Sequence, residues 1–177
     1  MIVMDNMQEL IEAPLSGQEL GMRYRDLCQD VRFANLPGKI ELDSWGRILM
    51  SPASNYHGAV QTALSAKLAV LGGRAFVEAS VLTATGVLVA DVAWASAEFM
   101  RAHGFETPFS RAPELCIEIA SPSNSRKELS EKLEAYLGAG AQEVWIVYPQ
   151  SRRCEFYGNQ GPVPSSRHAV DIADIFS

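Results

Sequence analysis

One stretch of this chain, residues 113–149, constrains the fold more than any other. It reads PELCIEIASPSNSRKELSEKLEAYLGAGAQEVWIVYP, the pattern of an apolar strand, a polar turn, an amphipathic helix and a second apolar strand. A capping box is predicted at the start of the helix, with Ser125 as N-cap and Glu128 at the third helical position. A strand–helix–strand unit within such a chain predicts an α/β fold, with a mixed central sheet flanked by helices.

The rest of the chain fits this architecture. No internal repeat, low-complexity tract or linker divides it, so we expect one domain over 1–177, with 1–16 as an arm or short helix. The other expected elements, in order, are a helix over 17–30, a strand pair over 39–52 turning near Trp45-Gly46, a helix over 56–73, a strand pair over 74–96 turning around 83–86, a loop over 98–111, an edge strand over 152–158 and a loop over 161–166.

Length and composition are those of an ordinary globular protein. The chain has 177 residues, of which 47% are hydrophobic and 20% charged, enough to bury a full core. Apolar runs fall short of the roughly eighteen residues that span a bilayer. The first residues, MIVMDNMQELIEA, are acidic rather than basic and do not resemble a secretory signal. We therefore expect a cytoplasmic protein without a membrane partner.

Cysteine content and net charge narrow the classes further. Cys28, Cys116 and Cys154 are odd in number and lack metal-ligand spacing, which favours reduced thiols over a disulfide framework. The net charge of −6 disfavours a protein that grips long duplex DNA through phosphate neutralisation alone. It does not exclude a nuclease, because bound divalent cations offset acidic ligands.

Two carboxylates stand in apolar strand patterns, Glu118 in LCIEI and Asp91 in GVLVADVAWAS. Each is costly to desolvate unless it is paired, hydrogen-bonded or bound to a metal. If the two strands pair, alternation lets Asp91 reach the face of Glu118. Two carboxylates so close repel unless protonated or bridged by a cation. Mg²⁺ suits carboxylate oxygens, a backbone carbonyl and waters, and would activate a bound water. Alternatively, each carboxylate makes a structural hydrogen bond or ion pair.

Three further residues are candidates for the same site. Lys132 lies beside the apolar stripe of its helix, where an ammonium could position a water or neutralise charge on a phosphate. It could equally be a lysine that extends to the surface. His57 opens the second helix and could contact metal or phosphate, or simply bond the helix start. Glu41, on a strand, could supply another acidic group.

These residues fall within a set of short motifs. Together the motifs resemble the bacterial Uma-two family of restriction-endonuclease-like proteins, within the PD-(D/E)XK nuclease superfamily. The resemblance covers about residues 38–177, and its most specific block is 113–149. The matching positions are Glu41-Leu42, Met50-Ser51-Pro52 with His57, Ala90-Asp91-Val92, the segment PELCIEIASPS over 113–123, Lys132 with Tyr136, and Gly140, Glu143, Trp145 and Val147.

This chain departs from the motifs at two positions. Ala90 stands where the family has proline before the aspartate, which should affect backbone shape rather than metal binding. Ala120 stands where the wider superfamily has its lysine, two residues after the glutamate. The resemblance implies that the lysine comes instead from the next helix, as Lys132. Ala120 is small and faces the same way as Glu118, which leaves room for it.

The resemblance implies an endonuclease dependent on Mg²⁺ or Mn²⁺ that hydrolyses phosphodiester bonds in DNA. Asp91, Glu118 and the Ile119 carbonyl would hold the metal, and Lys132 would orient the attacking water. Glu41 and His57 would be further catalytic residues. A homodimer is also expected, since cleavage of both DNA strands needs two sites.

A second hypothesis stays open: a catalytically inactive nuclease fold kept for binding or assembly. The acidic net charge and the lack of a separate DNA-reading element favour it, whereas intact Asp91, Glu118 and Lys132 favour the enzyme. Motifs of nucleotide hydrolases, serine esterases and zinc ribbons do not occur in the sequence. Convergence of the three side chains within about 4–6 Å is what a single metal-bridged cluster requires.

Overall fold

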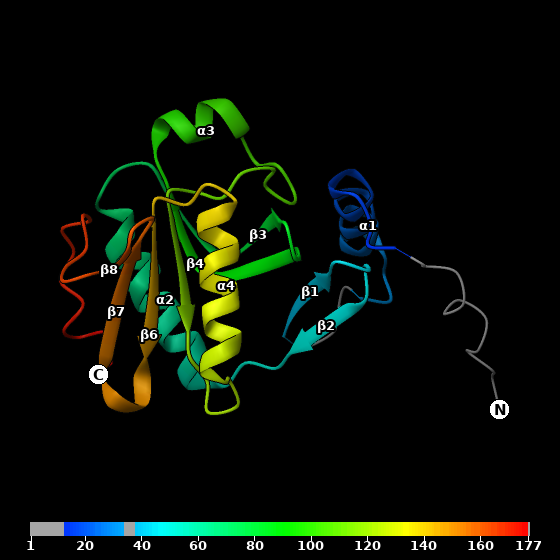
Figure 1. The fold of residues 1–177 in the computed structure, drawn as a ribbon. Coiled ribbons are helices and arrows are strands. Elements are labelled where there is room, and N and C mark those ends of the chain that lie inside the picture. The colour runs from blue at the N-terminus through cyan, green and yellow to red at the C-terminus, as the bar shows by residue number, and fades with distance from the viewer. Residues whose placement is uncertain (1–12, 34–37, 177) are drawn as a thin grey trace.

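The structure, a computed structural model, describes residues 13–33 and 38–176 as four α-helices and eight strands with one short 3₁₀ turn (Figure 1). In chain order these are α1 (Gly17–Gln29), β1 (Lys39–Asp43), β2 (Ile48–Ser51), α2 (Asn55–Ala69), β3 (Arg74–Thr83), β4 (Gly86–Ala95), α3 (Ala97–His103), β5 (Leu115–Ile119), α4 (Arg126–Gly138), β6 (Glu143–Tyr148), η1 (Pro149–Ser151), β7 (Arg153–Gly158) and β8 (Gly161–Val163).

All eight strands belong to one sheet, in the order β2-β1-β4-β5-β6-β7-β8, with β3 paired to β4. The neighbours β5 and β6 are parallel and are joined by α4, as the strand–helix–strand pattern predicts. The pairings of β1 with β2 and of β3 with β4 are antiparallel. The expected α/β fold with a mixed sheet flanked by helices is therefore confirmed, and the N-terminal strand pair is continuous with the main sheet.

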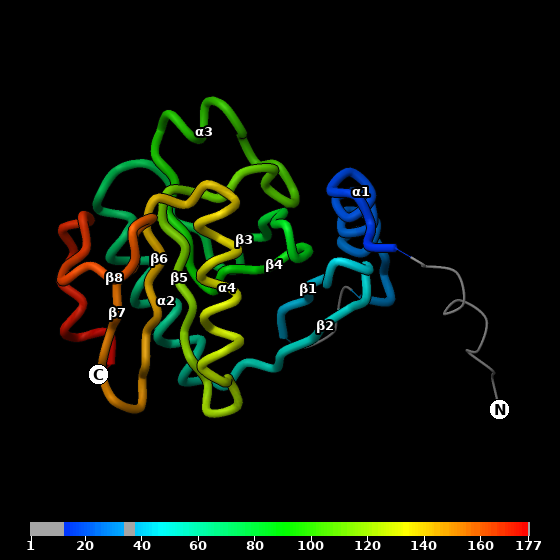
Figure 2. Tube along the Cα trace, viewed as in Figure 1, coloured from blue at the N-terminus to red at the C-terminus, as the bar shows by residue number. Residues whose placement is uncertain are grey.

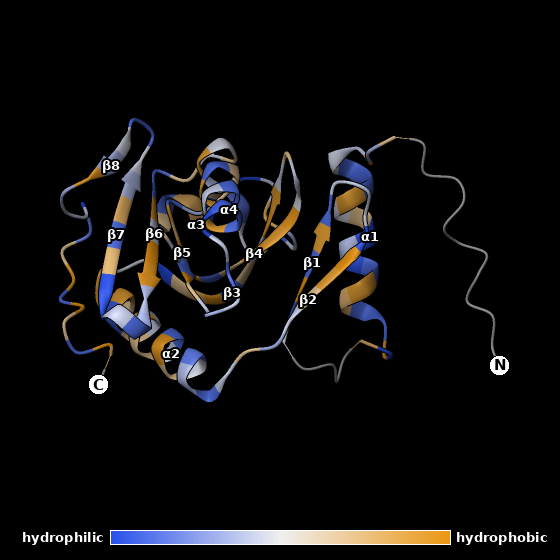
Figure 3. Ribbon diagram, turned by 60° about the horizontal axis from the view of Figure 1, so that its bottom comes forward, coloured by the Kyte–Doolittle hydropathy of each residue, from blue (hydrophilic) through white to orange (hydrophobic). Residues whose placement is uncertain are grey.

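Helices cover both faces of the sheet, with α4 on one face and α2 on the opposite face (Figures 1 and 2). The alternation of side chains along β5 explains both layers. Ile117 packs with the apolar side of α2, and Cys116 packs with that of α4. In α1, Leu20 and Tyr24 are buried against β1 and the start of β4. Figure 3 shows the corresponding apolar residues on the strands and on the sides of the helices.

The sheet forks along one edge of β4. Its start pairs with β1, where Leu42 lies opposite Val87, and its end pairs with β5 from Val92 onward. At Val89, between these pairings, side chains bond the backbone. The Val89 N–H donates to Glu41 Oε1 at 2.8 Å, and its carbonyl accepts from Lys39 Nζ at 2.8 Å. Because buried backbone groups need partners, these two charged side chains hold β1 to β4 inside the fork.

Two expectations for the second half of the chain are wrong. The predicted loop over 98–111 begins with helix α3, which Ser96 caps by accepting a hydrogen bond from the Phe99 N–H at 3.1 Å. Phe99 is the one buried residue of this short helix. One buried apolar position is too few to produce a helical period in the sequence. The predicted edge strand 152–158 is covered by β8, because Val163, in the predicted 161–166 loop, pairs with Phe156.

The expected arm over 1–16 falls largely outside the described residues, since the structure describes the chain from residue 13. The last of the sixteen, Ser16, caps α1 in a capping box with Glu19. In the parts of the chain that the structure describes, no helix has both the length and the apolar character needed to cross a membrane.

Candidate active site

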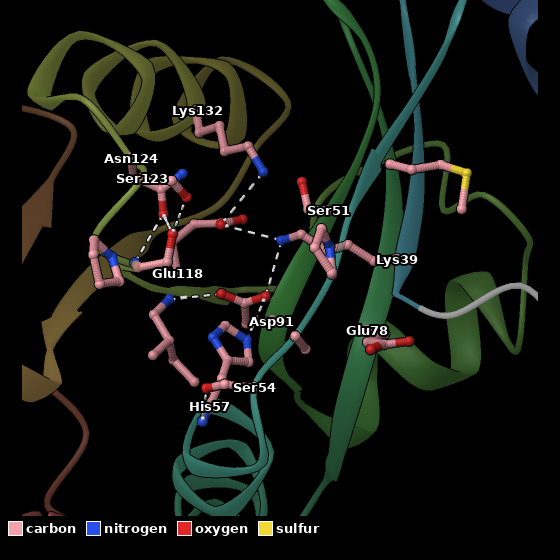
Figure 4. A pocket seen from close by; sticks show the side chains of 16 residues that line it. Lys39, Ser51, Ser54, His57, Glu78, Asp91, Glu118, Ser123, Asn124 and Lys132 are labelled. Atoms are coloured by element: carbon pink, nitrogen blue, oxygen red, sulfur yellow. Dashed lines mark hydrogen bonds and ion pairs between the residues drawn. The ribbon is translucent and has the colours of Figure 1, made fainter.

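The two strand carboxylates meet on one face of the sheet, inside the fork. Val92 lies opposite Ile117, so Asp91 and Glu118 occupy the next pair of positions along β4 and β5. Both are buried, with 1% and 4% of their surface exposed. One nitrogen contacts both, since Lys39 Nζ lies 2.9 Å from Asp91 Oδ1 and 3.3 Å from Glu118 Oε2 (Figure 4). The two carboxylates are thus within reach of a single cation.

Asp91 is held from two sides. His57 Nε2, at the start of α2, lies 3.3 Å from Asp91 Oδ1, and the Ile119 N–H donates to Oδ2 at 2.7 Å. Burial acts to raise the pKa of Asp91, but His57, Lys39 and the Ile119 N–H lower it to about 2. The N–H and the carbonyl of a strand residue point to the same edge, so the Ile119 carbonyl also faces β4. Asp91 is therefore a carboxylate in its charged form, fixed in orientation.

Glu118 has the opposite electrostatic surroundings. Its Oε1 accepts a hydrogen bond from the Tyr136 hydroxyl at 2.7 Å, and its Oε2 lies 3.4 Å from Lys132 Nζ. Burial and the neighbouring charge of Asp91 raise the pKa of Glu118, although Lys39 and Lys132 act against that rise. Burial also raises the pKa of Tyr136, which keeps its hydroxyl a donor. Glu118 therefore holds a proton more readily than an exposed glutamate does.

Lys132 and Glu41 complete the cluster from α4 and β1. Lys132 Nζ lies 2.8 Å from Glu41 Oε1, and the Lys132 side chain is 19% exposed, so it does not extend into solvent. The capping box of Ser125 and Glu128 forms as predicted and fixes the start of α4, two turns before Lys132. Every side chain predicted for the site thus lies in one charged cluster, and the Ile119 backbone borders it.

Lys39, at the centre of this cluster, was not among the residues predicted for the site. Lys39 lies two positions before Glu41 on β1, so strand alternation places both on one face, but it does not indicate which carboxylates Lys39 contacts. Tyr136 packs in the apolar cluster between α4 and the sheet, and its hydroxyl also donates to Glu118. Gln61, on α2, donates to the Asp91 carbonyl at 3.1 Å, and no motif pointed to it.

The cluster opens into a cavity of about 470 Å³ (Figure 4). Two segments without charged side chains line it, residues 50–54 at the end of β2 and residues 121–124 after β5. The second segment is braced by its own bonds, since Asn124 Oδ1 accepts from both the N–H and the hydroxyl of Ser121 at 2.9 Å. A small part of a substrate can therefore reach Asp91, Glu118 and Lys132 through this cavity.

The donors suit a divalent cation in their chemistry. Carboxylate and carbonyl oxygens are the ligands that Mg²⁺ and Mn²⁺ accept. With all side chains ionised, Glu41, Asp91 and Glu118 exceed the charge of Lys39 and Lys132 by one negative charge, which favours a cation. In the described residues, however, no three His, Cys, Asp or Glu side chains are arranged as a metal site. The lysine ammoniums lie between the carboxylates instead.

Comparison with protein families agrees with the motifs. The model of the family Uma2, described as "Putative restriction endonuclease", matches residues 23–169. The chain belongs to this family. A search of curated proteins found no match. Among solved structures, this Uma2 chain is similar to "a putative nuclease belonging to DUF820" from Anabaena variabilis ATCC 29413, with a TM-score of 0.65 and 22% identity over 81% of this chain and 94% of that one. This likeness confirms the fold.

The Uma2 motifs map onto two separate places in the structure. Asp91, Glu118 and Lys132, with Tyr136, form the charged cluster. Glu143 and Trp145 lie elsewhere, where the Trp145 indole N–H donates to Glu143 Oε1 at 2.5 Å. One part of the family pattern therefore describes a candidate active site, and another describes the packing of β6.

Proposed function

We propose that this Uma2 chain is an endonuclease that hydrolyses phosphodiester bonds in DNA with the help of Mg²⁺ or Mn²⁺. The convergence of Asp91, Glu118 and Lys132 at the bottom of one cavity supports this function most directly. Membership of a family described as restriction endonucleases supports the reaction class.

In this proposal Asp91 and Glu118 hold the ion, with the Ile119 carbonyl as a further oxygen donor. When bound, the ion would polarise the phosphodiester and lower the pKa of a bound water. Its two positive charges would offset the negative charge of the carboxylates and attract a phosphate. The acidic net charge of the chain is compatible with this local attraction.

The surrounding residues have positioning and electrostatic roles. The Lys132 ammonium, held by Glu41, is placed to orient the attacking water or to stabilise charge on the phosphate. His57 and the Ile119 N–H keep Asp91 charged and oriented, and the Tyr136 hydroxyl orients one oxygen of Glu118. Cleavage of both strands of a duplex needs two such sites, so we propose a homodimer as the form that acts on duplex DNA.

The proposal is tested by measuring Mn²⁺ binding and plasmid nicking on the same samples. We expect wild type to bind Mn²⁺ and to nick DNA only in its presence. The double variant Asp91→Ala/Glu118→Ala should lose both activities. Its nicking rate should fall by more than about 100-fold, because even residues that only orient metal ligands contribute 10–100-fold.

Asp174→Ala serves as the matched control, since it removes a carboxylate whose ion pair with Lys67 lies on the surface. It should bind Mn²⁺ and nick DNA like wild type. Wild type that neither binds Mn²⁺ nor nicks DNA at millimolar metal would leave the alternative, a catalytically inactive nuclease-fold module for binding or assembly. Nicking that is equal with and without metal would retain the nuclease but remove the metal.

A further inference from the structure

Lys39 occupies the position between the carboxylates of the candidate site. Its ammonium contacts Asp91 Oδ1 at 2.9 Å, Glu118 Oε2 at 3.3 Å and Glu41 Oε1 at 3.9 Å, and it donates to the Val89 carbonyl at 2.8 Å (Figure 4). The side chain is 11% exposed. Among the described residues, Lys39 is the only lysine that contacts both Asp91 and Glu118. Lys132 contacts Glu118 and Glu41.

A buried carboxylate pair needs a compensating cation, and here the protein supplies it from β1. The oxygen atoms that Lys39 contacts belong to the same two carboxylates that would hold a divalent ion. An ammonium at hydrogen-bonding distance from both leaves no room for an ion to bridge them. Lys39 and the metal therefore exclude each other from this position.

We propose that Lys39 is a built-in cation that holds Asp91 and Glu118 together in the metal-free protein and competes with the divalent ion for them. The proposal deepens the proposed function, on which it rests for the metal. Its consequence is that metal binding requires the Lys39 side chain to move, which lowers the apparent metal affinity.

The structure offers the displaced side chain a place. Lys39 lines the cavity of the candidate site and also a neighbouring cavity of about 190 Å³. Glu78, an exposed residue, lines both cavities as well and supplies the carboxylate in the lining of the smaller one. Its φ of +56° is unusual for a residue with a side chain in a strand, the kind of strained backbone found at functional sites. An ammonium that leaves Asp91 can therefore turn toward another carboxylate, at the exposed side of the same cavities.

The test is Mn²⁺ titration calorimetry of wild type and Lys39→Met, after circular dichroism has shown that both are folded. We expect Lys39→Met to bind Mn²⁺ at least about fivefold more tightly, in the usual range for coupled binding events. It should also unfold at a lower temperature without metal, because the Val89 carbonyl loses its donor. An affinity that is unchanged or lower in Lys39→Met would overturn the proposal.

Lys132→Met is the matched control for simple loss of positive charge. It removes a charge of the same sign next to Glu118 but leaves Asp91 and its contact with Lys39 in place. A smaller gain in affinity than that of Lys39→Met supports competition for a position. An equal or larger gain would show that only the net charge matters, and the proposal would fail.

A second measurement uses wild type, in case Lys39→Met does not fold. Nuclear magnetic resonance of ¹⁵N-lysine protein should show the buried Lys39 ammonium, identified by its absence in Lys39→Arg. Saturating Mg²⁺ should shift or remove this signal and leave that of Lys67, on the surface of α2, unchanged. A Lys39 signal that stays in place at saturating Mg²⁺ contradicts the proposal.

The results separate this proposal from the proposed function. Wild type that binds Mn²⁺ and nicks DNA while the Lys39 signal does not move would retain the nuclease and reject the competition. If wild type binds no Mn²⁺ but Lys39→Met does, the competition is supported, and the natural chain is an inactive module. Absence of binding in both proteins would reject both proposals.

Discussion

Two buried glutamates on neighbouring parallel strands have different surroundings. Glu118, near the end of β5, is 4% exposed, and Glu143, at the start of β6, is 2% exposed. The charges around Glu118 include two other carboxylates and two lysines. Glu143 instead accepts hydrogen bonds from three neutral donors, the Trp145 indole, the Ser166 hydroxyl and the Arg167 backbone N–H. The Arg167 guanidinium also forms an ion pair with it.

The difference shows in the pKa values of the two groups. Burial acts to raise the pKa of Glu143, but the hydrogen bonds from Ser166, Trp145 and Arg167 bring it below its usual value. Burial and Asp91 leave that of Glu118 above its usual value. Both residues belong to the family motifs, and both are buried, so burial alone does not separate a candidate catalytic group from a structural one. Crowding of like charges at a cavity does.

Among the tests of this comparison, the largest difference in metal binding and nicking should be between variants of the two histidines that lie beside these glutamates. His57 contacts Asp91, whereas His168 packs edge-to-face against Trp94 and Trp145 near Glu143. We expect His57→Ala to lower Mn²⁺ affinity and the nicking rate by about 10–100-fold, because it loses a partner that orients a metal ligand. His168→Ala should leave both unchanged. Equal losses in the two variants would show that the clusters do not differ in function.

Replacement of the two glutamates by glutamine should separate them by stability. Glu143→Gln places an amide group among donors, and we expect the free energy of unfolding to fall by about 2 kcal/mol. Glu118→Gln removes a charge from a crowded group and should change that free energy by less than about 1 kcal/mol. Urea unfolding at pH 7 without metal measures both values. A loss as large for Glu118→Gln would assign it a structural role like that of Glu143.

The smallest effect is the pH dependence of the same variants. Both glutamates start from a usual pKa of 4.5. Because the folded-state pKa of Glu118 is raised, its ionisation destabilises the fold as pH rises above 4.5. Between pH 4.5 and 7, Glu118→Gln should therefore gain stability relative to wild type over the part of the range that lies below the raised pKa. The lowered pKa of Glu143 makes its contribution present above pH 4.5 and lost below it. Each slope is limited to about 1.4 kcal/mol per pH unit, and urea unfolding across this range would expose slopes of the wrong sign.

The sequence predicts the site where its signals are local. The 113–149 stretch indicates both strands, the helix and its capping box, and strand alternation brings Asp91 to the face of Glu118. What it could not indicate is Lys39 as the common partner, because the lysine lies 52 and 79 residues from the carboxylates it contacts. A charged residue on a strand is ordinarily expected to face solvent, and only the fork in the sheet places it inside.

The same reasoning explains the elements that were missed. Helix α3 has seven residues and one buried side chain, so its boundaries depend on the Ser96 cap and on the Ser96–Glu114 hydrogen bond rather than on an apolar period. Strand β8 has three residues, Gly-Pro-Val, whose composition is typical of a turn. It is a strand because β7 offers it an edge to pair with.

The bonds from Glu41 and Lys39 to the Val89 backbone have a consequence for how relatives of this chain are interpreted. Loss of either side chain would leave a buried amide or carbonyl without a partner, so selection for a stable sheet would retain both residues in a descendant that had lost its activity. A glutamate and a lysine at these positions would therefore indicate that the fork in the sheet is intact. Inherited catalysis would have to be judged from Asp91 and from the cavity it faces.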